Sequence, residues 1–282
     1  MADVFENDFC DNPKILFISL VHNLIHAIIF LVLSRINNNM RKSFCAIFIF
    51  IFVVSYSQDK ADSSKTKLKA FATVSLNSNG IASIPAFSLD APAIIASLSL
   101  VKNRFSYDPT LAYGFDLRPW FIDNWLHYKI VNKPSFEFRT GFNISAFFSE
   151  YKLPDDESIL QSQKYLAIEL AATYKITRKN SLTLMYWNDR GQDKGAIKGH
   201  FINLIIDWSE IGLGKSVLMG INLQLFYINY DGNNDGLFIS PKVSAGIRNI
   251  PFTLFFQGTQ AIVSNIEPFP GFRWNIGVAY TL

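Results

Sequence analysis

Cysteine is nearly absent from this sequence of 282 residues. The chain contains two cysteines, Cys10 and Cys45, and no position after Cys45 holds another. The rest of the chain therefore has neither a disulfide framework nor a thiolate metal site. A Walker loop, a dinucleotide-binding fingerprint and zinc-ligand spacing are also missing. The sequence predicts no cofactor and no bound metal.

Charged residues are scarce and almost balanced in sign. Asp, Glu, Lys and Arg together make up 17% of the chain, and the net charge is +3. A soluble domain usually contains about 25% charged residues. The basic residues are spread along the chain and form no patch, which argues against a nucleic-acid partner. Aromatic residues are abundant by contrast, at 15% of the chain.

Residues 272–282 alternate between two kinds of side chain without interruption. One parity is apolar or aromatic: Phe272, Trp274, Ile276, Val278, Tyr280 and Leu282. The other parity is polar or small: Arg273, Asn275, Gly277, Ala279 and Thr281. A period of two is typical of a β-strand whose faces meet different surroundings. The apolar face is more hydrophobic than is usual for a strand of a soluble sheet, and it is typical of a strand that lies between lipid and a polar lumen.

The same alternation recurs at residues 104–118, 136–148, 166–176 and 239–248, with charged residues on the polar parity. Burying so many unpaired charges between two dry sheets would be costly. The pattern therefore predicts an all-β protein, a transmembrane antiparallel β-barrel with apolar side chains facing the lipid and charged side chains facing the lumen.

The breaks between these segments fall into two alternating kinds. Short breaks occur at residues 102–103, 132–134, 178–180, 210–214 and 249–251. Longer or more polar breaks occur near residue 90 and at 118–119, 150–163, 189–195, 231–236 and 264–271. Tight periplasmic turns alternating with longer outside loops are typical of such barrels. Counting back from the end predicts about twelve strands, the first of which ends near Leu89, although residues 66–89 could hold one long strand or two short ones.

The direction in which each side chain points, toward the lumen or toward the lipid, predicts two sets of residues. Charged side chains expected in the lumen are Arg104, Asp108, Asp116, Arg118, Asp123, Glu137, Arg139, Glu169, Lys175, Lys242, Arg248 and Arg273. Mixed signs favour cross-strand pairs, which leave either a narrow pore or a salt-bridged plug. Aromatic residues expected in two girdles at the membrane interfaces are Trp120, Tyr128, Tyr174, Tyr186, Trp208, Tyr227, Trp274 and Tyr280.

The N-terminal region has the features of a targeting sequence. Residues 40–57 have a basic start, a short apolar run and small residues before Gln58, which is typical of a cleavable signal peptide. Residues 15–33 are long enough for a membrane helix. We expect residues 1–39 to be an upstream extension from a misassigned start codon, or else an anchor helix. The barrel would then occupy residues 58–282.

The chain resembles the outer-membrane β-barrel proteins of Gram-negative bacteria. The resemblance is carried by the signal-like segment, the alternating strands and the last strand, GFRWNIGVAYTL. The Phe-rich strands, Gln58 and the stretch RFSYDPTLAYGFDLRPW resemble small envelope proteins of the Bacteroidota type. Such barrels often end in Phe or Trp, whereas this chain ends in Leu282. The resemblance implies insertion in the outer membrane, with the lipid bilayer, lipopolysaccharide and the assembly machinery as partners.

Three positions in the sequence are candidates for catalysis or metal binding. His127 shares a face with Asp123, Trp125 and Lys129, and a polar lumen residue is the simpler interpretation. His200 has no Ser or Thr neighbour and is interpreted as an interfacial residue. Residues 231–236, DGNNDG, match half of a calcium loop, but Lys242 stands where a bidentate Glu belongs.

These observations favour a barrel without a catalytic site, acting as a porin-like narrow channel or as a structural envelope protein. A small solute in the lumen would be its ligand. The alternatives are an outer-membrane enzyme, lipid-modifying or protease-like, and a surface-binding barrel that acts through its outer loops.

Overall fold

The computed structural model describes residues 67–152, 158–230, 232, 234–266 and 271–282. The predicted extension and signal peptide, residues 1–57, lie outside the described residues. Within the described part of the chain, no helix has the length and hydropathy needed to cross a bilayer.

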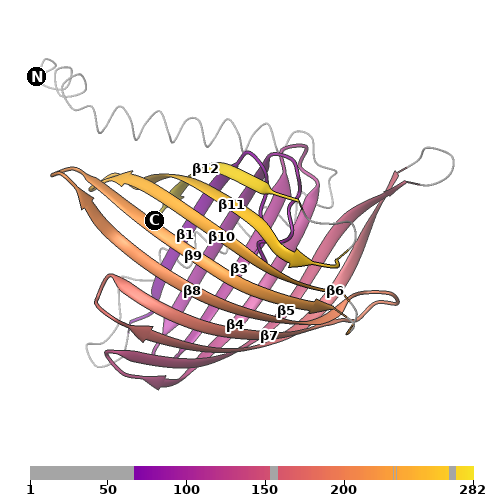
Figure 1. The fold of residues 1–282 in the computed structure, drawn as a ribbon, viewed down its shortest axis with the longest axis horizontal. Coiled ribbons are helices and arrows are strands. Elements are labelled where there is room, and N and C mark those ends of the chain that lie inside the picture. Colours follow the sequence, from indigo (N-terminus) through magenta and orange to yellow (C-terminus); the bar gives the residue numbers. More distant parts are fainter. Residues whose placement is uncertain (1–66, 153–157, 231, 233, 267–270) are drawn as a thin grey trace, which may run out of the picture. The chain divides into compact units, whose positions relative to one another are not determined.

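Twelve strands form one antiparallel sheet that closes on itself (Figure 1). Their bounds are β1 Lys69–Asn77, β2 Ala93–Lys102, β3 Phe105–Gly114, β4 Pro119–Asn132, β5 Phe136–Lys152, β6 Ser158–Lys175, β7 Asn180–Gly191, β8 Lys198–Leu213, β9 Val217–Tyr230, β10 Asn234–Ile247, β11 Phe252–Ser264 and β12 Arg273–Thr281. Each strand pairs with its sequence neighbours, and β1 pairs with β12 from Thr73↔Thr281 to Asn77↔Gly277. The predicted fold class, an all-β barrel of about twelve strands, is confirmed.

The connections differ at the two ends of the barrel. At one end, here called the turn end, the linking segments are residues 103–104, 133–135, 176–179, 214–216 and 248–251. At the opposite end, the loop end, the longest connection is residues 78–92, between β1 and β2. The connections at the turn end have two to four residues, whereas those at the loop end range from three residues, between β9 and β10, to fifteen. The predicted alternation of short and long connections is therefore confirmed only in part, because the β3–β4 and β9–β10 connections are as short as the turns.

The outer surface of the barrel is apolar and exposed. Leu126 is 55% exposed, Ile144 55% and Ile168 54%, and every strand except β2, whose apolar side chains are half-buried, has at least one exposed large apolar residue. Continuous apolar surface of this extent is typical of contact with lipid. The inward parity carries buried polar groups, including Asn143, Glu169 and Asn275. This inversion of the soluble pattern defines a membrane-spanning barrel.

Several strand ends differ from the sequence prediction, and the break predicted at 150–163 is reduced to residues 153–157 between β5 and β6. The first strand ends at Asn77, well before Leu89, because residues 78–92 leave the wall and fold into the lumen. The strand predicted at 103–118 ends at Gly114, where a tight turn places Leu117 at φ 65°. Strand β8 runs past the predicted break to Leu213, because a bulge near Glu210 (φ 52°) absorbs the irregularity.

The β5–β6 hairpin extends beyond its neighbours at the loop end (Figure 1). The pairing of β4 with β5 ends at Phe121↔Phe147, whereas β5 and β6 remain paired as far as Lys152↔Ser158. The pairing of β6 with β7 ends at Tyr165↔Gly191. The last residues of this hairpin therefore project past the barrel rim as a two-stranded arm.

Candidate functional site

The lumen is divided by residues 78–92, here called the inner loop. Ile81, Ala82 and Ala86 are at most 7% exposed, which shows that the loop is buried inside the barrel. The loop is a narrow hairpin, since Leu89 N donates to Gly80 O over 2.9 Å and Ala82 N donates to Phe87 O over 2.9 Å. Small residues suit this position because the segment has to fit between the walls.

Opposite walls of the barrel hold the inner loop. Ser83 Oγ donates to Asp123 Oδ2 on β4 over 3.0 Å. From the other side, Arg273 Nη1 on β12 donates to the carbonyl oxygen of Ala86 over 2.7 Å. Phe87 stacks on Tyr230 of β9, with ring centroids 5.9 Å apart. These contacts with three strands fix the loop across the lumen.

Two cavities flank the inner loop, and both include Ala82 and Ser83 in their lining. The loop-end cavity has a volume of about 280 Å³ and is lined by the ends of β4 to β7 and by Tyr230. The turn-end cavity, of about 570 Å³, is lined mainly by short polar side chains such as Ser97, Thr110 and Asn222. The inner loop is thus the element that separates the two halves of the lumen.

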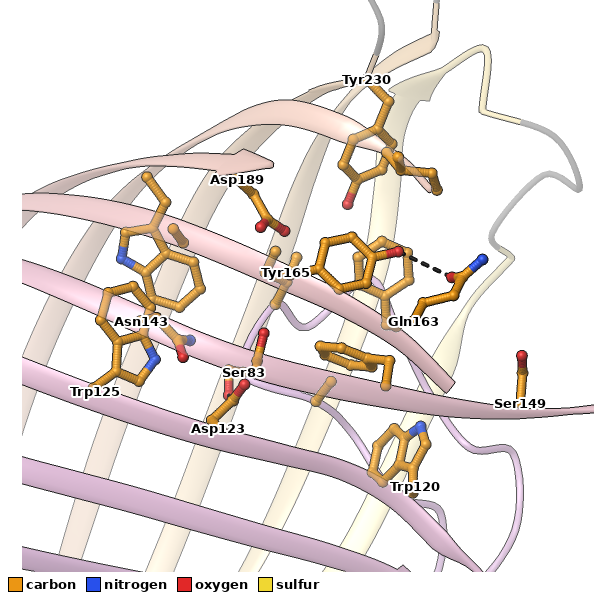
Figure 2. Close-up of a pocket in the computed structure, with 18 of the residues that line it drawn as sticks. Ser83, Trp120, Asp123, Trp125, Asn143, Ser149, Gln163, Tyr165, Asp189 and Tyr230 are labelled. Carbon is orange, nitrogen blue, oxygen red and sulfur yellow. Dashed lines mark hydrogen bonds between the residues drawn. The ribbon is translucent and has the colours of Figure 1, made fainter. Parts of the chain in front are cut away.

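Aromatic rings and carboxylates form the wall of the loop-end cavity (Figure 2). Asp123 on β4 is 4% exposed and accepts the hydrogen bond from Ser83. Asp189 on β7 lines the same cavity, and its Oδ1 atom is buried without a hydrogen-bond partner among the described residues. The aromatic and amide residues around them are Phe87, Trp120, Trp125, Asn143, Phe147, Gln163, Tyr165, Trp187 and Tyr230.

An aromatic band continues from this cavity along the inner wall. Trp125 lies 4.9 Å from Trp187, centroid to centroid, and Trp187 lies 5.0 Å from Phe201. The band passes on to Phe226 and Phe238, whose rings stack at 5.1 Å. Four of the five rings come from consecutive strands, β7 to β10, so the lumen has one apolar wall of rings in contact with one another.

A charged cluster lies on the neighbouring wall, closer to the turn end. Glu169 is 1% exposed and accepts hydrogen bonds from Arg139 Nε (2.8 Å) and Trp187 Nε1 (2.7 Å). His127 Nδ1 lies 2.7 Å from Asp108 Oδ2, and its Nε2 lies 3.5 Å from Glu169 Oε1. Both acids thus have basic partners, and we interpret the cluster as a structural network that stabilises the barrel wall.

The histidine candidates do not assemble a nucleophilic site. His127 is sandwiched between acids, and its ring is stacked flat on Trp125 at 5.3 Å. Ser99 and Ser106 both donate to Asp108, so neither hydroxyl is placed on the imidazole. His200 Nδ1 lies 2.8 Å from Tyr186 Oη on the outward face. Of the calcium-like residues, 231 and 233 lie outside the described residues, and no cluster of metal-binding side chains occurs in the part that is described.

Seven of the predicted lumen charges lie on the inward parity of strands: Asp108, Asp123, Glu137, Arg139, Glu169, Lys242 and Arg273. Lys175 is at the exposed end of β6. The prediction is wrong for Arg104, Asp116, Arg118 and Arg248, which lie in connections outside the strands. Arg118 pairs there with Asp116 and Glu150. The reason is that strands β3 and β10 begin or end at tight turns, and alternation carries no information beyond a turn.

Trp120 is a second correction, since it lies inside the barrel and not in the outer girdle. It is 7% exposed and lines the loop-end cavity. Ala112 pairs with Phe121 and Tyr113 with Pro119, so Trp120 is the extra residue of a bulge and leaves the outward face. Gly80 makes room for its ring, because a Cβ there would lie 2.7 Å from Trp120 Cζ3. The other predicted girdle residues have outward parity: Tyr128, Tyr174, Tyr186, Trp208, Tyr227, Trp274 and Tyr280.

Sequence reasoning missed three features of the lumen. It did not anticipate the inner loop, the carboxylate of Asp189, or the inward aromatic band. Asp189 falls at the start of a predicted outside loop, although its parity matches that of Trp187 on the inward face of β7. Extending the alternation of that strand by two residues would have found it.

Comparison with known proteins adds a likeness of fold. No protein-family model matches the chain, and no curated protein matches it. Among solved structures, the KdgM porin aligns with 13% identity and a TM-score of 0.49 over 74% of this chain and 98% of that one. The COG4313 outer membrane channel from Pseudomonas putida F1 aligns with 12% identity and a TM-score of 0.45 over 79% and 99%. The NanC porin aligns with 10% identity and a TM-score of 0.44 over 76% and 100%.

The class of protein is defined by the chain's own geometry. A closed antiparallel barrel with an apolar outer face and a polar, partly filled lumen is a β-barrel of the outer-membrane type. An element folded into the lumen separates two cavities.

Proposed function

We propose that the chain forms a narrow, porin-like channel for small solutes in the outer membrane of a Gram-negative bacterium. The observation that carries the proposal is the inner loop, which is fixed to β4 and β12 and has a cavity on each side. A purely structural barrel of this size needs no polar space on both sides of an inserted loop. The inner loop is then the constriction, and its position sets the bore.

The proposal includes an orientation. The turn end faces the periplasm and the loop end faces outward, so that the β5–β6 arm extends from the cell surface. The seven outward aromatic residues form the two interfacial girdles, and lipopolysaccharide surrounds the outer half of the belt. The assembly machinery inserts the mature chain after the signal peptide has been removed.

Conductance of the refolded barrel in a planar bilayer tests this function. Leu89 N donates to Gly80 O, so an Asn-Gly turn can replace residues 81–88 without moving the walls. We expect the wild type to give small, uniform conductance steps and the shortened variant to give steps several-fold larger. Arg118→Gln changes only the exposed rim and is the control, with wild-type steps expected. If neither the wild type nor the shortened variant conducts, the channel proposal is wrong.

A further inference from the structure

The loop-end cavity has an unbalanced charge. Two carboxylates, Asp123 and Asp189, line it, and none of its described lining residues is Lys, Arg or His. Two other acids of the lumen have basic partners: Glu137 lies 2.8 Å from Lys129 Nζ, and Glu169 lies 2.8 Å from Arg139 Nε. The acids of the loop-end cavity differ from these two, because neither Asp123 nor Asp189 has an ion pair with a Lys, Arg or His of the cavity lining.

One of the two carboxylates, that of Asp189, has a buried oxygen, Oδ1, without a hydrogen-bond partner among the described residues. Asp123 accepts a hydrogen bond from Ser83, a neutral donor, although it is 4% exposed. A buried acceptor without a donor is costly, and a ligand that supplies donors and positive charge would remove that cost.

Aromatic faces complete the surroundings of these acids. Trp125 packs against Trp187, and Figure 2 shows Trp125 on one side of the two acids and Tyr165 and Trp120 on the other. Indole and phenol rings attract a cation through their negative faces, and they also pack against apolar groups. A site with two acids and several such rings matches a cation that carries a hydrophobic group.

From these observations we propose that the loop-end cavity binds a small organic cation, an ammonium or guanidinium group attached to an apolar or aromatic body. The inference rests on the proposed function, because the cavity lies on the route of a solute through the lumen. Its volume of about 280 Å³ is at the lower limit of ordinary ligand pockets, roughly 300–1,000 Å³. A compact monoamine fits this space, whereas an extended oligomer does not.

A neutral sugar is the competing ligand, because sugars also stack on aromatic rings and donate to carboxylates. Asn143 and Gln163, which line the cavity, could serve such a ligand. The cation is favoured because a sugar supplies no positive charge to a cavity whose lining includes two carboxylates and no Lys, Arg or His among its described residues.

Three matched compounds test the proposal on the refolded full chain in detergent micelles. Phenethylamine is the cation, 2-phenylethanol is the neutral analogue and phenylacetate is the anion, and maltose represents a neutral sugar. Binding is followed by tryptophan fluorescence, to which Trp120, Trp125 and Trp187 contribute from the cavity wall. We expect phenethylamine to bind at least tenfold more tightly than 2-phenylethanol, and phenylacetate and maltose not to bind.

Variants then assign the site. Asp189→Asn and Asp123→Asn keep the shape and remove the charge, and each should weaken phenethylamine binding at least tenfold. Asp207→Asn is the matched control, since Asp207 lines the turn-end cavity, and binding should be unchanged. A gel with and without boiling verifies that each variant is folded. Equal binding of amine and alcohol, tighter binding of maltose, no binding of any compound, or full binding by the Asp123→Asn/Asp189→Asn double variant would each overturn the proposal.

The binding assay needs no ion flow, so its result is separate from the conductance result. A barrel that binds the amine but never conducts retains this site and loses the proposed channel. A barrel that conducts without amine preference retains the channel and loses this site.

Discussion

Arg273 Nη1 donates a hydrogen bond to the carbonyl oxygen of Ala86, 2.7 Å away, and so joins the last strand of the barrel to the loop that follows the first strand. The same guanidinium lies 3.6 Å from Asp90 at the base of that loop. One side chain therefore holds the tip of the inner loop and the base of its second arm against β12. Since these contacts are made inside the barrel, the bore depends on a residue far from the loop in sequence.

Arg273→Gln should loosen the inner loop. The substitution removes the ion pair with Asp90 and shortens the donor to Ala86, so the loop can move within the lumen. We expect single-channel recordings to show more frequent closures and greater open-channel noise, with little change in folding yield. Arg248→Gln, at the turn end, is the control and should leave the recordings as they are. Unchanged noise in Arg273→Gln would mean that other contacts hold the loop.

Glu169→Gln should destabilise the barrel. Glu169 is 1% exposed and accepts hydrogen bonds from Arg139 and Trp187, so the neutral amide loses charge-assisted bonds and places a donor against Arg139. The expected loss is about 1.5–3 kcal/mol in the free energy of unfolding. Urea unfolding of the refolded protein in micelles measures it.

Glu150→Gln provides the comparison for this measurement. Glu150 pairs with Arg118 on the exposed rim, where an ion pair contributes about 0–1 kcal/mol. The two variants make the same chemical change in different surroundings. If they unfold at the same urea concentration, the buried cluster around Glu169 does not stabilise the wall.

Leu111→Arg and Thr110→Arg should differ in membrane insertion. These neighbours on β3 face opposite ways: Leu111 points outward, and Thr110 lines the turn-end cavity. An arginine on the lipid face costs up to about 2–4 kcal/mol at the middle of the bilayer, whereas one in the polar lumen stays hydrated. The fraction folded into vesicles, read from migration with and without boiling, should fall for Leu111→Arg only. The reverse order would invert the assigned faces.

The mature protein should begin at Gln58. Residues 40–57 have the pattern of a cleavable signal, and the first described strand begins at Lys69. Mass spectrometry of the protein purified from native envelopes measures the N-terminus directly. A peptide from residues 1–39 in that material would show that the upstream segment is retained.

Strand positions follow from the sequence because a membrane barrel imposes the same constraint on every strand. One face meets lipid, so the alternation is long and regular, and residues 166–176 and 239–248 fall within β6 and β10 apart from a residue at one end. The number of strands, twelve, can also be predicted from the sequence, because polar breaks separate the alternating segments.

The structure of the lumen is harder to predict from the sequence, for a physical reason. Packing inside the barrel is satisfied by long-range contacts, such as Ser83 with Asp123, that no local period reports. The bulge at Trp120 reverses a face with one extra residue, and the inner loop mixes small and large apolar residues without alternation. The sequence therefore predicts the wall of the site, while the loop and the acids it brings together require the folded chain.

The seam between β1 and β12 holds five residue pairs, against seventeen between β5 and β6. The ring cannot be completed until the final strand has been synthesised, and every shorter fragment leaves two unpaired edges. Assembly must consequently be post-translational, with closure of this short seam as its last step. A nascent chain stalled before β12 would be a substrate for periplasmic proteases.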